Sequence, residues 1–264
     1  MVASSTNSNG YVTVALSGLL GLIFVATMFT GAVAQEQTDS VNEAQRLMIV
    51  AKTAQEEGHY DDAIRAYRQV VVLSKESPKN AALAYFNAGI LYLRFKKYEN
   101  AVNAFRQSIL LDPNSAEANN NLGEALGALK QYAPAVAAFQ RAVALNANLL
   151  IAQFNMGLTY NQIGQSKYAE FVYKVLIRDH PDYPLGYDGM AVTLAKSGRA
   201  RDAIPFHEKA IGLSPDSPFF YYNLGVSYLV LGNTKKALEQ KERLLRLDPL
   251  AANRLATLIA KHQK

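Results

Sequence analysis

The sequence predicts an all-α protein: a right-handed superhelical solenoid of about six helical hairpins, followed by a C-terminal capping helix. The first observation behind this prediction is an internal repeat. Alanines recur every 34 residues through the last five units, and the gap before these units is 38 residues. A fixed period of this length is typical of stacked helical hairpins. The alanines, called anchor alanines below, are Ala63, Ala101, Ala135, Ala169, Ala203 and Ala237.

The second observation is the size of the residues around each anchor alanine. Twelve positions before it stands a small residue, and small residues at both sites let two helices approach closely. Four positions after it, one helical turn away on the same face, stands a large side chain that fills the remaining space. This side chain is aromatic in the first four units. Because His207 and Lys241 replace it in the last two, we expect looser packing there.

The third observation concerns the residues that end the helices. Four units carry a glycine between their two helices, where a helix commonly ends in a left-handed residue. Lys96 and Lys130 take this place in the second and third units, which predicts strained turns. The repeats are predicted to start near residues 44, 82, 116, 150, 184 and 218, so that the array covers 44–251. Residues 252–264 then form the capping helix that covers the last hairpin. The four glycines are Gly58, Gly164, Gly198 and Gly232.

The second repeat contains the most informative motifs, NAGILY at 87–92 and YENAVNAFRQSILLDP at 98–113. Related strings recur as NLGEAL in the third repeat and NLGVSY in the last. In these motifs the chain resembles the tetratricopeptide repeat family, in particular its membrane-anchored scaffold and assembly factors. The resemblance covers 44–251. It implies an array that binds a protein segment on a concave surface lined by the first helix of each hairpin.

An apolar segment precedes the repeats. Residues 11–34 contain no charged residue, and roughly twenty such residues span a bilayer. After a short tail at 1–10 they predict a transmembrane anchor, joined to the array by a linker at 35–43. Since the first basic residues, Arg46 and Lys52, follow the segment, the repeats are expected on the cytoplasmic side. The alternative is a signal peptide cleaved after Ala34, which would make the repeats periplasmic or secreted.

The resemblance also places the candidate binding groove. The sixth position of the repeat is Asn in four units, and its amide offers a donor and an acceptor that match an extended peptide backbone. The same asparagines can instead serve contacts between helices. The fifth and ninth positions are mostly apolar, with a polar band in the third repeat, so we predict an apolar or extended peptide ligand. The predicted groove residues are Asn87, Asn121, Asn155, Asn223, Phe86, Ile90, Asn120, Glu124, Phe154, Leu158 and Tyr222.

Composition excludes several kinds of chemistry. There is no cysteine, and therefore no disulfide, thiolate nucleophile or cysteine-based metal site. The four histidines fall in separate repeats, so none forms a metal-binding pair. No phosphate-binding loop and no hydrolase motif occurs. We therefore predict a protein that is not an enzyme and that needs no cofactor or metal.

The net charge of +5 gathers at the C-terminal end, where eight basic residues from Lys235 onward meet three acidic ones. Such an end is either a solvated helix surface or a contact for an acidic partner or anionic lipid. Nucleic acid is not expected as a partner, because no nucleic-acid-binding module accompanies the charge.

Together these features predict a membrane-tethered, non-catalytic scaffold for protein–protein interaction that helps to assemble a membrane complex. Anchored repeat proteins of similar build assist photosystem I assembly, which is an analogy of architecture. One alternative is an exported envelope protein of a secretion, pilus or cell-wall machine. Another is a regulatory subunit of a separate enzyme.

Overall fold

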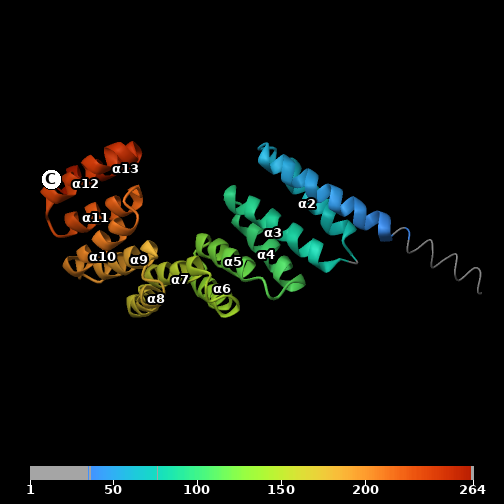
Figure 1. Cartoon of the computed structure of the whole chain (residues 1–264), viewed down its shortest axis with the longest axis horizontal. Helices are drawn as coiled ribbons and strands as arrows, with labels where there is room; N and C mark the ends of the chain where they lie inside the picture. The colour runs from blue at the N-terminus through green and yellow to red at the C-terminus, as the bar shows by residue number, and fades with distance from the viewer. Residues whose placement is uncertain (1–34, 36, 76, 263–264) are drawn as a thin grey trace, which may run out of the picture. The chain divides into compact units, whose positions relative to one another are not determined.

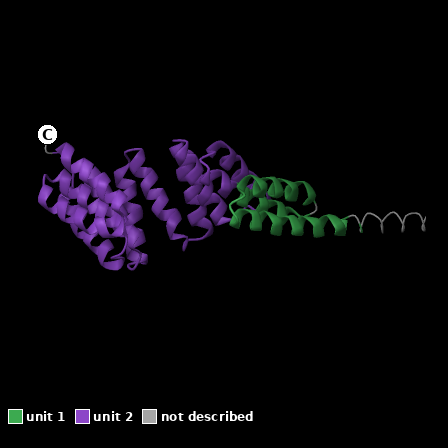
Figure 2. Cartoon of the chain, turned by 90° about the horizontal axis from the view of Figure 1, so that it is seen from above, with its two compact units in different colours: residues 1–88 green, residues 89–264 purple. Residues whose placement is uncertain are grey.

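The computed structural model describes residue 35 and residues 37–75 and 77–262. The chain divides into two compact units, residues 1–88 and 89–264, which Figure 2 colours separately. The described residues form helices joined by short turns, which confirms the all-α prediction (Figure 1). The predicted membrane segment at 11–34 lies outside the described residues. Within the described part, no helix combines the length and the apolar character needed to cross a bilayer.

The first unit contains a helix over residues 37–56, then α2 (Tyr60–Leu73) and the first part of α3 (Pro78–Arg94). Ala51 and the anchor Ala63 are both fully buried, as a close approach between the first two helices requires. Tyr67 is buried beside them, and its hydroxyl donates a hydrogen bond to the side chain of Gln55 at 3.3 Å. The pair joins the two helices of this hairpin.

The irregular 38-residue gap in the repeat is taken up inside α3. This helix has 17 residues, whereas α5, α7, α9 and α11 have 13 each. It begins at Pro78, four residues before the expected repeat start at 82, because proline is well suited to the first helical position. The carbonyl of Ser77 accepts hydrogen bonds from the backbone of Asn80 and Ala81. The extra residues therefore lengthen the helix rather than the loop.

The second unit continues the alternation of shorter first helices and 14-residue second helices. Each helix from α4 to α13 contacts the next along the chain, and the first helices of successive hairpins also contact one another. The first helices thus form one layer, which is where the predicted groove lies. The elements are α4 (Tyr98–Leu111), α5 (Ala116–Ala128), α6 (Tyr132–Leu145), α7 (Leu150–Gln162), α8 (Ser166–Asp179), α9 (Pro184–Lys196), α10 (Ala200–Leu213), α11 (Pro218–Val230), α12 (Thr234–Leu247) and α13 (Pro249–His262).

Close contacts between small and large residues hold the hairpins together. A Cβ built on Gly89 would lie 2.6 Å from the ring of Phe105, and one on Gly123 would lie 2.7 Å from the ring of Phe139. Real Cβ atoms do not approach other atoms so closely, so only glycine admits these rings. The predicted pairing of small and aromatic positions therefore has a direct steric basis.

The looser packing expected in the last two units is not observed. His207 is fully buried and hydrogen-bonded on both ring nitrogens. In the last hairpin Leu255 of α13 occupies the space beside Gly225 that an aromatic residue fills elsewhere, at 2.5 Å from a Cβ built there. Lys241 instead extends to Glu242, at 2.9 Å. A buried histidine and a leucine from the next helix thus replace the missing aromatic rings.

The capping helix begins earlier than the expected residue 252. α13 starts at Pro249, and the carboxylate of Asp248 accepts hydrogen bonds from the backbone of Leu250 at 2.9 Å and Ala251 at 3.0 Å. An aspartate in this place caps a helix start, and proline suits the first position after it. The Asp–Pro pair therefore starts a helix here.

Lys96 and Lys130 adopt the left-handed backbone that the turn requires, with φ of 57° and 60°, while the four predicted turn glycines have φ between 70° and 84°. A residue with a side chain adopts this backbone at a cost of about 1–2 kcal/mol relative to glycine, and this cost is partly offset because glycine loses more chain entropy on folding.

We expect Lys130→Gly to raise the free energy of unfolding by about 0.5–1 kcal/mol, measured by urea denaturation. Ala128→Gly, at the end of α5, should lower it by about 1 kcal/mol. A loss of stability in Lys130→Gly would contradict this account.

Candidate functional site

A shallow depression of about 260 Å³ lies on the layer of first helices, between α5 and α7. It is called the α5–α7 depression below. It brings together three of the predicted groove residues, Glu124, Asn155 and Leu158. Sequence reasoning missed other lining residues, although Thr159 and Gln162 follow Asn155 and Leu158 by one helical turn and share their face. The lining residues are Gly123, Glu124, Gly127, Tyr132, Phe139, Asn155, Leu158, Thr159 and Gln162.

A short row of hydrogen-bonded amides includes Asn155, which lines this depression. The side-chain nitrogen of Asn155 donates to the side-chain oxygen of Asn120 at 3.3 Å, and Asn120 donates to Asn121 at 3.1 Å. The first contact joins α7 to α5, as the alternative interpretation of these asparagines anticipated. It uses one of the two N–H groups of Asn155, which leaves a donor and the carbonyl acceptor for a ligand. The contacts hold the amides in fixed orientations.

Two predicted groove residues are buried in the free protein. Phe154 is 6% exposed and packs against Tyr173 with ring centroids 6.1 Å apart. Asn120 is also 6% exposed. Neither side chain is displayed on an open surface in this structure. Their positions in the repeat share a face with the groove, but the neighbouring helices cover them.

The remaining predicted residues lie apart from the depression. Tyr222 is half-buried at the C-terminal end, with the guanidinium of Arg254 5.9 Å from its ring centre. Asn223 donates to Asp188 at 2.8 Å, and so serves a contact between helices. Ile90 is half-buried on α3 in the second unit. Phe86 and Asn87 are half-buried on the same helix in the first unit.

A buried polar cluster joins α9, α10 and α11. Nδ1 of His207 lies 2.8 Å from a carboxylate oxygen of Asp188, and Nε2 lies 3.0 Å from the hydroxyl of Ser227. The other oxygen of Asp188 accepts the hydrogen bond from Asn223. These four residues are called the His207 cluster below. Because an ionised carboxylate can only accept hydrogen bonds, Nδ1 carries a proton.

The order Asp–His–Ser in this cluster has the hydrogen-bond geometry of a hydrolase triad. The nucleophile of such a triad must reach a substrate, yet Asp188, His207 and Ser227 are each at most 2% exposed. The hollows found between α5 and α12 of the second unit are lined by other residues. The arrangement therefore fits a satisfied internal network that links three helices.

The same region perturbs a buried phenol. Burial raises the pKa of Tyr173 far above its ordinary value of 10.0, and the negative charge of Asp188 raises it further. The Tyr173 hydroxyl donates to the backbone carbonyl of Phe154 at 3.2 Å. A Cβ on Gly189 would collide with the Tyr173 ring. This contact explains why the sixth position holds glycine here, whereas four other repeats have asparagine.

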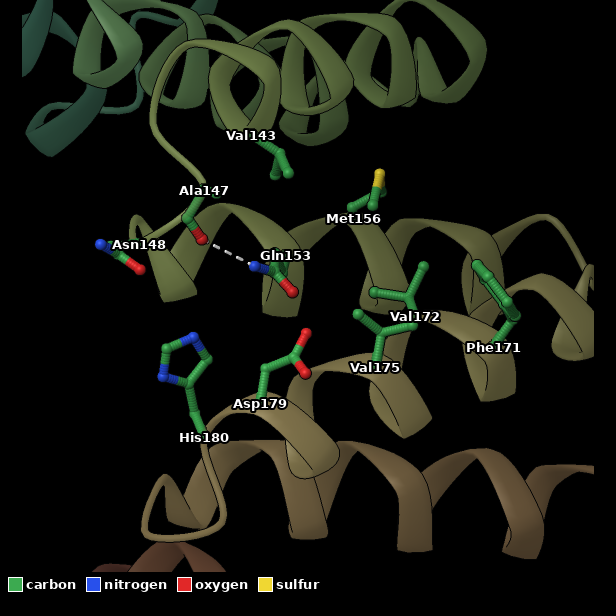
Figure 3. A pocket seen from close by; sticks show the side chains of 10 residues that line it. All are labelled: Val143, Ala147, Asn148, Gln153, Met156, Phe171, Val172, Val175, Asp179 and His180. Atoms are coloured by element: carbon green, nitrogen blue, oxygen red, sulfur yellow. Dashed lines mark hydrogen bonds between the residues drawn. The ribbon is translucent and has the colours of Figure 1, made fainter.

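A second hollow, of about 460 Å³, lies between α6, α7 and α8 (Figure 3). Val143, Met156 and Val175 form apolar walls, and Phe171 at the edge is 67% exposed. Asp179 and His180 lie at the other end of the hollow from Phe171, as Figure 3 shows. None of the predicted groove residues lines it. In the sequence, Phe171 is an aromatic residue at a position without a packing role in the repeat, and this is the only signal for the hollow.

The negative charge of Asp179, at the polar end of this hollow, is largely balanced by a neighbouring guanidinium. Asp179 accepts two hydrogen bonds from the guanidinium of its neighbour Arg178, at 2.7 and 2.8 Å. These hydrogen bonds lower the pKa of the Asp179 carboxyl. The hollow therefore offers an apolar surface with little unbalanced charge.

Comparison with protein families resolves the identity of the fold. Tetratricopeptide repeat profiles match residues 51–102, 86–149 and 189–260, and a further profile of the same description matches 151–183. The chain belongs to the tetratricopeptide repeat family. A search of curated protein sequences gives no significant match.

Solved structures with the same fold include three informative ones. A structure of MamA protein is 26% identical with a TM-score of 0.58, covering 66% of this chain and 93% of that chain. PilW, described as a widely conserved type IV pilus biogenesis factor, is 26% identical with a TM-score of 0.65, covering 78% and 94%. A tetratricopeptide repeat protein from Parabacteroides merdae has a TM-score of 0.72 at 15% identity, covering 84% and 87%, and supports the fold alone.

Proteins of this family generally serve as non-catalytic scaffolds, and the chain accordingly has the architecture of a protein–protein interaction module. Its family and fold follow from the sequence pattern.

Proposed function

We propose that this protein is an assembly scaffold whose groove, on the first helices of the repeats, holds an extended or apolar segment of a partner protein. The observation that carries the proposal is the α5–α7 depression. It combines an apolar wall at Leu158 with the oriented amide of Asn155, which retains a donor and an acceptor. An extended peptide presents this alternation of apolar side chains and backbone polar groups.

Substitutions can distinguish the groove from the hollow beside Phe171 as the binding site. We expect Leu158→Ser and Asn155→Ala each to weaken the binding of an extended peptide about tenfold, since each removes roughly 1–2 kcal/mol of contact. The peptide is first selected from an array of ten-residue apolar and polar sequences, and affinity is then measured by fluorescence anisotropy. Phe171→Ser is the matched control on the other surface and should leave affinity unchanged.

The opposite pattern, with loss in Phe171→Ser and full affinity in the groove variants, would move the binding site to the hollow of Figure 3. Phe154 is not a suitable position for this test. Because it is buried against Tyr173, a polar substitution there would disrupt the fold together with any binding. Circular dichroism of each variant confirms that the helices are retained.

We further propose that residues 11–34 tether the array to a membrane with the repeats on the cytoplasmic side. The support is the uncharged run of 24 residues and the basic residues that follow it. A tether of this kind would place the groove beside membrane subunits during assembly, the role of photosystem I assembly factors of similar build.

The similarity to PilW favours a second candidate, an exported envelope protein that takes part in a pilus or secretion machine. The two candidates differ in the N-terminus of the protein recovered from cells. A full-length species in membranes, cut by protease only from the cytoplasmic side, supports the tethered scaffold. A species that begins at Gln35 and lies outside the cytoplasm supports the envelope protein and contradicts the tether.

A further inference from the structure

The α5–α7 depression contains a single charged side chain. Of its nine lining residues only Glu124 is acidic and none is basic, and the side chain of Glu124 is exposed on α5. The ion pairs found in the described part of the chain do not include it. The described residues also contain no cluster of acidic residues or histidines that could hold a metal ion. The depression therefore presents one uncompensated negative charge to a ligand.

The walls around this charge are suited to an aliphatic chain. Leu158 and the ring of Tyr132 supply apolar surface above the buried ring of Phe139, and Gly127 leaves open space, with no atom within 4 Å of a Cβ built there. Lysine and arginine combine a long apolar stem with a charged end, and they place the stem on apolar surface while the charge stays near water or a partner. A volume of about 260 Å³ is large enough for one such side chain.

Polar groups beside Glu124 complete the match. Asn155 and Gln162 line the same depression, and their amide oxygens accept hydrogen bonds from N–H groups. A guanidinium or ammonium offers only donors, so a carboxylate with neighbouring amide oxygens suits it. A carboxylate or phosphate on the ligand would instead be repelled by Glu124.

From this geometry we propose that the groove selects partner segments that carry a lysine or arginine, whose side chain enters the α5–α7 depression and pairs with Glu124. The proposal rests on the groove function proposed above and adds its specificity. The ligand is thus a basic, otherwise apolar, extended peptide segment. The anionic residue in the third repeat determines the register of the segment in the groove.

The test uses a positional library of ten-residue peptides with one central residue fixed as Arg, Lys, Gln or Glu and the other positions mixed among apolar residues, Ser and Asn. Binding to the full chain is measured by anisotropy at low and physiological salt. We expect wild type to bind the Arg and Lys pools about threefold more tightly than the Gln pool and to bind the Glu pool most weakly, since an exposed ion pair is worth roughly 0.2–1 kcal/mol. The preference should shrink with added salt, because this ion pair is near solvent.

Three variants identify the residue responsible. Glu124→Gln should remove the preference, and Glu124→Lys should reverse it in favour of the Glu pool. Glu117→Gln, an exposed change on the first turn of α5 that does not line the depression, should keep it. Equal binding of all pools by wild type, or an unchanged preference in Glu124→Gln, overturns the specificity proposal while the groove stands. If no pool binds at all, the groove function and this proposal both fail.

Discussion

Asp188→Ala is expected to lower the free energy of unfolding by about 3–5 kcal/mol, because it breaks a buried network that includes an ionisable pair. Asp188 is 1% exposed and accepts hydrogen bonds from both His207 and Asn223. Without it the Nδ1–H group of His207 loses its acceptor in a place that water does not reach. An unpaired buried donor costs more than the original hydrogen bond contributes.

Urea denaturation followed by circular dichroism measures this loss, and amide hydrogen exchange shows where it falls. Because each repeat contacts only its neighbours, exchange should increase most in α9, α10 and α11. Asp202→Ala is the control: it removes an exposed aspartate of α10 that pairs with Arg199, and should change stability by less than about 1 kcal/mol. Equal effects of the two substitutions would show that the His207 cluster is not a stabilising network.

A double substitution adds a sharper criterion. In the second and third repeats the position of His207 holds Phe105 and Phe139, so His207→Phe restores the common residue of the array. We expect His207→Phe alone to destabilise, because it leaves Asp188 with only Asn223 as a partner. Combined with Asp188→Ala it should recover part of the loss, since an apolar pair then replaces the polar one.

Much of the fold can be derived from the sequence because it depends on local spacing. The 34-residue period, the glycines that face aromatic rings, and the turn positions each follow from the geometry of one hairpin. The left-handed backbone of Lys96 and Lys130 follows in the same way from their place in the repeat. These features hold whichever side chains lie in the neighbouring hairpins.

What the sequence could not show depends on contacts between hairpins. Asn120 is at a groove position, yet it is buried and bonded to Asn155 of the next hairpin. Phe154, at another groove position, is covered within its own hairpin by Tyr173. Leu255 of α13 fills the space beside Gly225 of α11 where an aromatic ring is missing, so this contact joins the capping helix to the last repeat. The His207 cluster likewise requires Asp188, His207 and Ser227 to meet from three helices. Tyr132 lines the depression but was absent from the predicted groove, because it lies on α6, a second helix, and the prediction used first helices alone.

Leu255→Ala is expected to cost about 3 kcal/mol, within the range of about 2–5 kcal/mol for buried leucines. Leu255 is fully buried, and its methyl group fills the space beside Gly225 where the last hairpin lacks an aromatic residue. Because α13 packs on α11 and α12, the loss should open these three helices first, which would be seen as faster amide exchange there before global unfolding.

Leu250→Ala is the matched control in the same helix, because Leu250 is 74% exposed and its substitution should change stability by at most about 0.5 kcal/mol. Similar losses in both variants would mean that α13 is held by its general apolar surface, and that the contact of Leu255 with Gly225 has no special part in closing the array.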